Sequence, residues 1–147
     1  NDAPSSITRL QNMGTPDYLI SAAVTVVLAQ RLARKNCPDC REPDPDVTPA
    51  ALKEMHFTEE QISTAKASRG KGCSKCKDTG YKGRMGIYEI LSVTKPIKEA
   101  ILKKATTPEL KAIALSEGFK TMQDMGRTLI LNGDLNFREF DRVLAME

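Results

Sequence analysis

The clearest structural signal in this chain is GCSKCKDTGYKGRMGIYEI, residues 72–90. It places Cys73 and Cys76 with two residues between them among four glycines, and then continues into alternating apolar residues. Two residues between thiols let a tight turn aim both sulfurs at one point, and glycine adopts the positive φ that such turns need. The stretch therefore predicts a cysteine turn that leads directly into a strand.

A second pair with the same spacing, Cys37 and Cys40, lies earlier in the chain, with thirty-two residues between the two pairs. Two such turns facing each other supply the tetrahedral sulfur set of a structural Zn²⁺ ion, at about 2.3 Å per sulfur. We predict one Zn²⁺ per chain, bound by Cys37, Cys40, Cys73 and Cys76. Because all four ligands come from the protein, the predicted ion is structural rather than catalytic. Nearby bases offset the charge of four thiolates: Lys35, Arg41, Lys71, Lys75 and Lys77.

The alternatives for the four thiols are two disulfides, a redox dithiol, or four unrelated cysteines. The chain shows no export signal, so we expect it in the cytoplasm, where thiols stay reduced. Neither pair lies in a βαβ pattern, which disfavours a thioredoxin-like couple. The single histidine, His56, is expected to be a surface loop residue.

The composition is that of a globular chain of about one domain. The 147 residues are enough to bury a core without disulfides, with 40% hydrophobic and 28% charged residues. A net charge of +3 and a pI of about 8.7 fall short of the pI above about 9 that is typical of dedicated nucleic-acid domains. The longest apolar run, residues 18–29, is shorter than the roughly twenty residues of a membrane span. We expect this run to be buried.

Capping patterns predict a mostly helical α+β fold. Thr48-Pro49 begins a helix, Thr58 and Gln61 have the spacing of a capping box, and Asn136 with Glu139 repeats that pattern. The strand after the second cysteine pair is expected at 85–93. The C-terminal third is expected to form a helical bundle. Predicted helices cover 6–13, a long segment from 17, then 49–55, 58–68, 95 onward, 107–118, 121–132 and 137–146.

The 147 residues contain no phosphate loop and no Ser-His-Asp set. The residues alone therefore predict a metal-stapled module without catalytic residues. An alternative function is a zinc-ribbon nucleic-acid-binding module, but aromatic residues that could stack on nucleobases are scarce, and only Tyr81 and Tyr88 lie near its basic residues. A third is a zinc adaptor that binds protein partners. In the zinc-ribbon alternative, basic side chains would contact the phosphates of the nucleic acid: Lys71, Lys75, Lys77, Lys82 and Arg84.

Four segments together resemble the C-terminal part of the secretion ATPases that assemble type IV pili and drive type II secretion. The start of the chain, 1–14, is similar to the end of the histidine box of that family and the helix that follows. The segment 28–32 (LAQRL) leads into the first cysteine pair. The second pair with 79–84 (TGYKGR) and the strand 86–89 (GIYE) complete the match.

The resemblance implies a larger machine than this chain. Members of the family are cytoplasmic homohexamers at the inner membrane, where RecA-like domains hydrolyse ATP with Mg²⁺ and act on a membrane platform protein. The phosphate loop and the other catalytic boxes of the family precede Asn1. The resemblance thus implies a non-catalytic, monomeric fragment with no nucleic-acid partner. It divides the chain into the end of a RecA-like domain (1–36), a tetracysteine zinc subdomain (37–83), and a strand with the C-terminal helical part (84–147).

Two arginines match positions of the family that bear on nucleotide binding. Arg84 matches an arginine close to the adenine, where a guanidinium can stack on the base. Arg31 matches the arginine of an Ala-Gln-Arg-Leu stretch. For both residues the alternative is a surface arginine. The sequence does not separate pilus extension from type II secretion.

Overall fold

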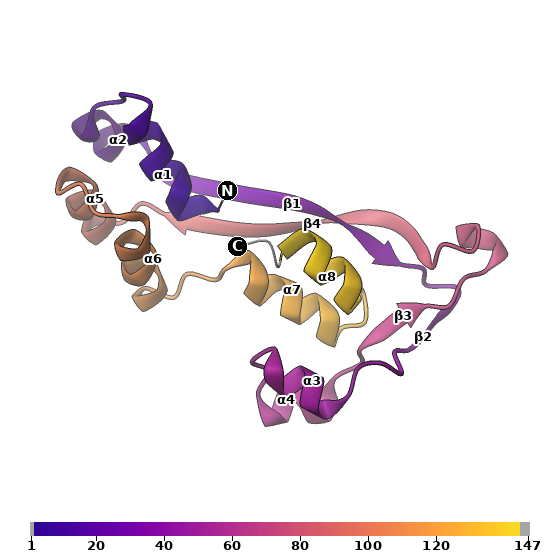
Figure 1. Cartoon of the computed structure of the whole chain (residues 1–147). Helices are drawn as coiled ribbons and strands as arrows, with labels where there is room; N and C mark the ends of the chain where they lie inside the picture. Colours follow the sequence, from indigo (N-terminus) through magenta and orange to yellow (C-terminus); the bar gives the residue numbers. More distant parts are fainter. Residues whose placement is uncertain (1, 145–147) are drawn as a thin grey trace. The chain divides into compact units, whose positions relative to one another are not determined.

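A computed structural model describes residues 2–144 of the chain (Figure 1). Within this range there are eight α-helices, one 3₁₀ helix and two sheets of two strands each, so the predicted α+β class is confirmed. The chain divides into two compact units. The first joins Asn1–Gln30 to Tyr88–Met122, and the second joins Arg31–Ile87 to Gln123–Glu147. Each unit is thus assembled from two separate stretches of chain.

Strands β1 (Val26–Asn36) and β4 (Tyr81–Ser92) pair with each other and run in opposite directions (Figure 1). The strand predicted at 85–93 is confirmed and begins earlier. The long helix predicted from Asp17 is wrong, because α2 (Asp17–Ala23) ends and the chain continues as β1. The residues at the change are Val24-Thr25-Val26-Val27, and β-branched side chains lose rotamer freedom in a helix but fit a strand. The prediction that the run 18–29 is buried is also wrong, because Tyr18, Val26 and Leu28 are 65%, 53% and 55% exposed.

The first unit packs four helices around one apolar core: α1 (Ala3–Asn12), α2, α5 (Lys95–Leu102) and α6 (Thr107–Ser116). Ile7, Ile20, Ile97, Ile101 and Leu110 are almost completely buried there. The predicted helices at 6–13, 95 onward and 107–118 are confirmed. The pairs α2·α5 and α1·α6 are in contact, so the C-terminal third does not form one bundle as predicted. Its first two helices bury their apolar faces against the N-terminal helices instead.

Glu89 is a buried carboxylate in this unit, with 3% of its surface exposed. It accepts hydrogen bonds from the backbone N–H of Ala3 at 2.5 Å and of Met122 at 3.0 Å. The first turn of a helix has N–H groups without intrahelical partners. Glu89 therefore accepts hydrogen bonds from free N–H groups at the beginning of α1 and at the beginning of α7 (Met122–Leu131).

The second unit contains the segment between the cysteine pairs. Strands β2 (Arg41–Pro43) and β3 (Ser68–Gly70) are antiparallel, with Arg41 opposite Gly70. Between them lie α3 (Pro49–Glu54) and α4 (Glu59–Thr64), where the predicted caps Thr48 and Thr58 are confirmed. The helix predicted to reach 68 ends at Thr64, because residues 68–70 pair with β2.

The same unit holds most of α7, followed by α8 (Phe137–Leu144). The helix predicted at 121–132 is confirmed, and Gly133 follows it with a φ of 80°. The helix predicted at 137–146 is confirmed as far as Leu144, and its last positions lie outside the described residues. In the part of the chain that the structure describes, no helix is both long enough and apolar enough to span a bilayer.

Glu139 is the buried carboxylate of the second unit, with a relative exposure of 0%. It accepts hydrogen bonds from the backbone N–H of Arg34 at 2.8 Å and from the guanidinium groups of Arg34 and Arg142. The Arg34 guanidinium lies 4.1 Å from the centre of the Tyr81 ring. Asn136 caps α8 by accepting from the Glu139 N–H, and its amide donates to the Tyr81 hydroxyl. These five side chains connect β1, β4 and α8.

The charge of Glu139 stabilises this unit. Burial alone raises the pKa of a carboxyl, but the hydrogen bonds from Arg142 and Arg34 lower the pKa of Glu139 to about 2. A lowered pKa stabilises the folded chain above the pKa of an unfolded glutamate, about 4.3, and this stabilisation is lost as pH falls toward 2.

We predict that Glu139→Gln lowers the free energy of unfolding by about 2 kcal/mol at pH 7, the cost of charge-assisted hydrogen bonds. Urea unfolding of both chains at several pH values measures the difference, which should shrink between about pH 5 and pH 2. Glu54→Gln, an exposed change in α3 of the same unit, is the control and should stay within about 0.5 kcal/mol. A Glu139→Gln deficit that is independent of pH would show that the charge contributes nothing.

Candidate metal centre

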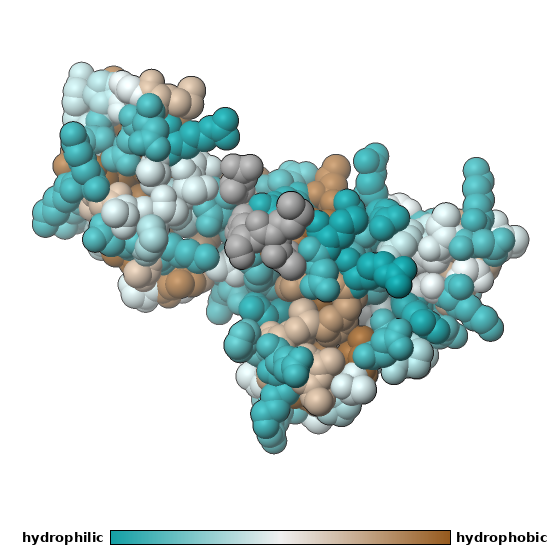
Figure 2. Space-filling view, viewed as in Figure 1, coloured by the Kyte–Doolittle hydropathy of each residue, from teal (hydrophilic) through white to brown (hydrophobic). Residues whose placement is uncertain are grey.

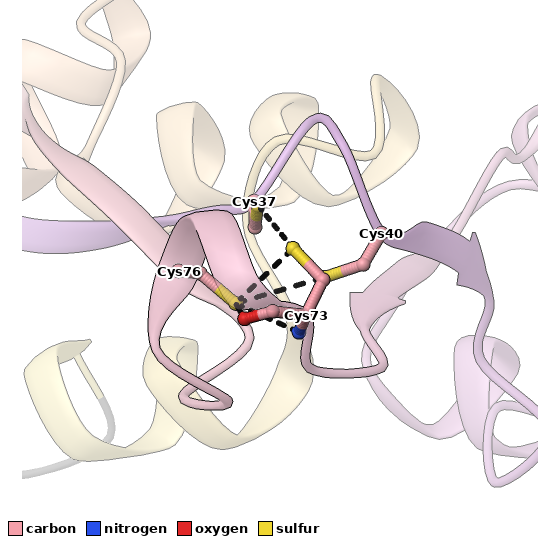
Figure 3. Close-up of side chains that lie close together, drawn as sticks. All are labelled: Cys37, Cys40, Cys73 and Cys76. Atoms are coloured by element: carbon pink, nitrogen blue, oxygen red, sulfur yellow. Dashed lines mark hydrogen bonds between the residues drawn. The ribbon is translucent and has the colours of Figure 1, made fainter.

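The four cysteine sulfurs gather around one point, with all four Sγ atoms within 4.8 Å of one another (Figure 3). The Sγ–Sγ distances are 3.9 Å for Cys37 and Cys73, 3.9 Å for Cys40 and Cys76, and 3.7 Å for Cys73 and Cys76. Four sulfurs at about 2.3 Å from a tetrahedral ion lie about 3.8 Å apart. A disulfide has its sulfurs near about 2.05 Å, and all four cysteines are free. The cluster therefore fits a metal ion and not two disulfides.

Backbone N–H groups point at two of these sulfurs. Gly72 donates to the Sγ of Cys40 at 3.3 Å, while Cys73 and Gly80 donate to the Sγ of Cys76 at 3.2 and 3.3 Å. Gly72 and Gly80 have φ values of 106° and 79°, as predicted for glycines that shape the cysteine turns. The turns thus aim both their sulfurs and their N–H donors at the same point, an arrangement that stabilises thiolates.

The pKa values of two thiols differ within this cluster. Burial by itself raises the pKa of Cys76, but the N–H groups of Cys73 and Gly80 and the adjacent thiols lower it to about 6. Burial and, to a lesser extent, the three other thiols raise the pKa of Cys40 to about 12. The hydrogen bond from the N–H of Gly72 lowers it but does not offset the rise. Several thiolates within 4.8 Å repel one another. A cation bound between the sulfurs would offset this repulsion.

The first cysteine turn is fixed on both sides by buried backbone contacts. Cys37 has 0% exposure, and its N–H donates to the carbonyl of Gly80 at 2.9 Å. The preceding residue, Asn36, is also completely buried. Its side-chain amide donates to the carbonyls of Ser68 and Gly133 at 3.0 and 2.9 Å. The first cysteine turn is thereby hydrogen-bonded to β3 and to the turn between α7 and α8.

Gly70 and Gly80 let two backbones approach closely beside the cysteines. A Cβ atom on Gly70 would overlap the carbonyl oxygen of Gly80, and a Cβ on Gly80 would stand 2.5 Å from the carbonyl oxygen of Gly70. Gly70 does not adopt positive φ, so its requirement for glycine is steric. The distance between β3 and the second cysteine turn thus depends on the absence of a side chain at Gly70.

We predict that Gly70→Ala destabilises the chain by about 3 kcal/mol, the upper part of the range for overpacking. Gly83→Ala is the matched control, since Gly83 has a φ of 80° but nothing within 4 Å of its Cβ position. It should cost about 1 kcal/mol from conformational strain alone. Chemical unfolding of both variants in the presence of metal measures the two costs. Equal costs would contradict the close approach.

The other predicted site residues lie outside the cysteine cluster. Arg84 is exposed on β4, and Arg31 on β1 is partly buried with a hydrogen bond of 2.6 Å to the carbonyl of Val143. Neither belongs to the cluster of metal-binding side chains found in the described range, and their contacts with nucleotide stay predictions. His56 is exposed, as expected.

Asp39 and Asn36 are site residues that were not predicted from the sequence. Asp39 lies inside the first cysteine turn, and its carboxylate pairs with Lys75 at 3.2 Å and Lys82 at 3.5 Å. Two bases assigned to the nucleic-acid alternative are therefore held by the first turn. For Asp39 the available signal was an acidic residue between the thiols of the first pair, in a chain with several lysines near the second pair. For Asn36 the signal was a single amide immediately before the first cysteine.

The family of this chain follows from its sequence taken as a whole. A model of the type II/IV secretion system protein family matches residues 1–142. The chain belongs to this family. The resemblance stated from the cysteine turns and the adjacent segments is thus confirmed at the level of the family.

Relatives of this chain are named as type IV pilus assembly ATPases and as type II secretion system proteins. The type IV pilus assembly ATPase PilB of Thermus thermophilus is 41% identical over 140 residues, which cover 95% of this chain and 16% of that protein. The ATPase of the same name from Myxococcus xanthus is 35% identical, with 95% of this chain and 25% of that protein covered. The putative type II secretion system protein E of Escherichia coli is 32% identical, with 99% and 29% covered. The chain spans less than a third of the length of these relatives.

Proposed function

We propose that this chain is the C-terminal zinc-binding part of a hexameric motor ATPase that powers type IV pilus assembly or type II secretion. The observation that carries the proposal is the cluster of four free thiols in a chain whose relatives are named as pilus assembly ATPases. In this proposal the chain contributes structure to the motor and not its chemistry, since the 147 residues contain no phosphate loop.

The donor set supports zinc as the metal. Soft thiolates in a tetrahedral set of four are the ligands of structural Zn²⁺ or of iron–sulfur clusters, and sulfurs 3.7–3.9 Å apart suit a single Zn²⁺ ion. When bound, Zn²⁺ would cross-link the two cysteine turns. The N–H donors of Gly72, Cys73 and Gly80 orient the sulfurs and stabilise their charge.

We predict one Zn²⁺ per chain, measured by elemental analysis together with native mass spectrometry. Cys73→Ser or chelation should increase amide hydrogen exchange in residues 37–83, because the cross-link between the turns is lost. The helices α5 and α6 of the first unit, which contains no cysteine, should keep their protection. Ser74→Ala, a neighbouring change that removes no ligand, is the control. A metal-free chain with full protection at 37–83 would contradict the assignment.

The exposed face of the long sheet supports a place at the end of a RecA-like domain. In the first unit, Val26, Leu28 and Ile90 are 53%, 55% and 55% exposed, with Val26 and Leu28 on alternate positions of β1 and Ile90 on β4. A sheet of two strands is marginally stable in isolation, and exposed apolar patches mark surfaces that another part of a protein covers. In this proposal the remainder of the longer motor covers that face.

In the same proposal, the chain supplies three parts of the motor. The segment 1–36 ends the RecA-like domain, 37–83 is the zinc subdomain, and 84–147 completes the ATPase domain. ATP and Mg²⁺ bind to the whole motor, where Arg84 and Arg31 lie near the nucleotide. The motor works as a cytoplasmic homohexamer on a platform protein of the inner membrane, and the chain alone is a monomer without a nucleic-acid partner.

We predict that Cys73→Ser in the complete gene product reduces assembly-dependent ATP hydrolysis and the number of surface pili or the amount of secreted protein. The physical reason is disorder of the zinc subdomain at subunit contacts. ATPase assays, size-exclusion chromatography and counts of pili or secreted protein measure the effect. The Ser74→Ala protein serves as the control. Normal hydrolysis and normal export by a zinc-free Cys73→Ser protein would overturn the proposal.

A further inference from the structure

A polar pocket of about 450 Å³ lies in the second unit, beside the metal centre. Its walls come from the loop after β2, from β3, from the start of β4 and from the beginning of α8. Hydrophilic side chains border the surface between α8 and the β2–β3 sheet, with a smaller hydrophobic area beside them (Figure 2). None of the four cysteines lines this pocket, so it is distinct from the cysteine cluster.

The side chains that line the pocket include three cations and two carboxylates. Its two carboxylates are Asp44, which accepts a hydrogen bond from the backbone N–H of Asp46 at 3.0 Å, and Asp46 itself. Of its three cations, Arg69 is paired with Glu42 at 3.3 Å and with Asp46 at 3.9 Å. The other two, Lys71 and Arg138, are exposed, and within residues 2–144 neither has an ion-pair partner. Two positive charges are therefore available to a ligand.

The metal-ligating turns hold the walls in place. Lys71 donates its backbone N–H to the carbonyl of Cys40 at 3.1 Å, and the next residue, Gly72, donates to the Sγ of Cys40. On the opposite wall, the Tyr81 hydroxyl accepts a hydrogen bond from Asn136 at 2.9 Å. Hydrogen bonds thus hold the backbone at Lys71 and the start of α8 before any ligand binds, which lowers the entropic cost of ordering these walls.

We propose that this pocket binds an acidic peptide segment of a partner protein. A carboxylate side chain would pair with Lys71 and Arg138, and an apolar side chain would contact Val47 and Phe137, which also line the pocket. The volume of about 450 Å³ is in the range of pockets that take drug-sized ligands and far exceeds the volume of a single phosphate ion. Binding does not depend on the proposed motor function, since the 147-residue chain contains the whole pocket.

The test is an NMR titration of the ¹⁵N-labelled chain with three probes. The first is the blocked hexapeptide Glu-Asp-Leu-Glu-Asp-Phe, the second is the same peptide with lysine at the four acidic positions, and the third is inorganic phosphate. We expect saturable shifts of the amides of Lys71, Tyr81 and Arg138 with the acidic peptide. The lysine peptide and phosphate should leave these amides unchanged.

Charge reversal separates binding from folding. The double variant Lys71→Glu and Arg138→Glu should weaken binding of the acidic peptide roughly tenfold, because two attractive charges become repulsive. An acidic residue at position 138 is favourable in the first turn of α8. Because Lys71 lies near the thiolates, the amide spectrum and the metal content of the variant are compared with those of the unmodified chain, and affinities are compared only when both are unchanged. Lys95→Glu reverses an exposed charge in the first turn of α5 and is the matched control. It should leave the affinity within about twofold.

Three results would overturn the proposal. The first is the absence of saturable shifts up to about 5 mM acidic peptide, a concentration above the Kd of weak complexes. The second is an equal response to phosphate, which would identify a small-anion site. The third is equal binding of the lysine peptide or an equal loss of affinity in Lys95→Glu, because either would show that Lys71 and Arg138 do not select the ligand.

Discussion

Four sulfurs within 4.8 Å of one another organise the second unit. Thiolates at this distance repel unless a cation lies between them, and the thiols are supplied by turns that are thirty-two residues apart in the chain. Once the turns meet, the N–H of Cys37 donates a hydrogen bond to the carbonyl of Gly80, and the side-chain amide of Asn36 donates one to the carbonyl of Gly133 after α7. The segment between the cysteines and the last two helices are therefore arranged around the same point.

Buried carboxylates have an organising role in both units. Glu89 satisfies the first N–H groups of two helices in the first unit, while Glu139 joins Arg34 and Arg142 in the second. A buried carboxylate is costly unless it is hydrogen-bonded, and each of these accepts bonds on both of its oxygens. Each unit is built from two separate stretches of chain. Each carboxylate is hydrogen-bonded to residues from both stretches of its unit, so it links segments that are far apart in the sequence.

In the proposed motor, the cysteine cluster and the polar pocket would contribute a binding surface rather than ATP hydrolysis. A zinc ion with four protein ligands has no position for a substrate, so its value lies in the surface that it shapes. Lys71 and Tyr81 adjoin residues that hydrogen-bond to the cysteine turns, and both line the pocket. A rigid, charged surface favours a partner of opposite charge, because little conformational freedom is lost when it docks.

Features that depend on local chemistry could be predicted from the order of the residues. The spacing of the cysteines predicted the four thiols that lie close enough together to hold a metal ion. The caps at Thr48, Thr58 and Asn136 located helix starts, and the glycines beside the cysteines marked positive φ. Each of these features depends on residues close in the chain. The division of the run after Asp17 into α2 and β1 became clear only in three dimensions, as did the packing of α5 and α6 with the N-terminal helices. Pairing between distant strands and burial against distant helices depend on long-range contacts, which local propensity does not contain.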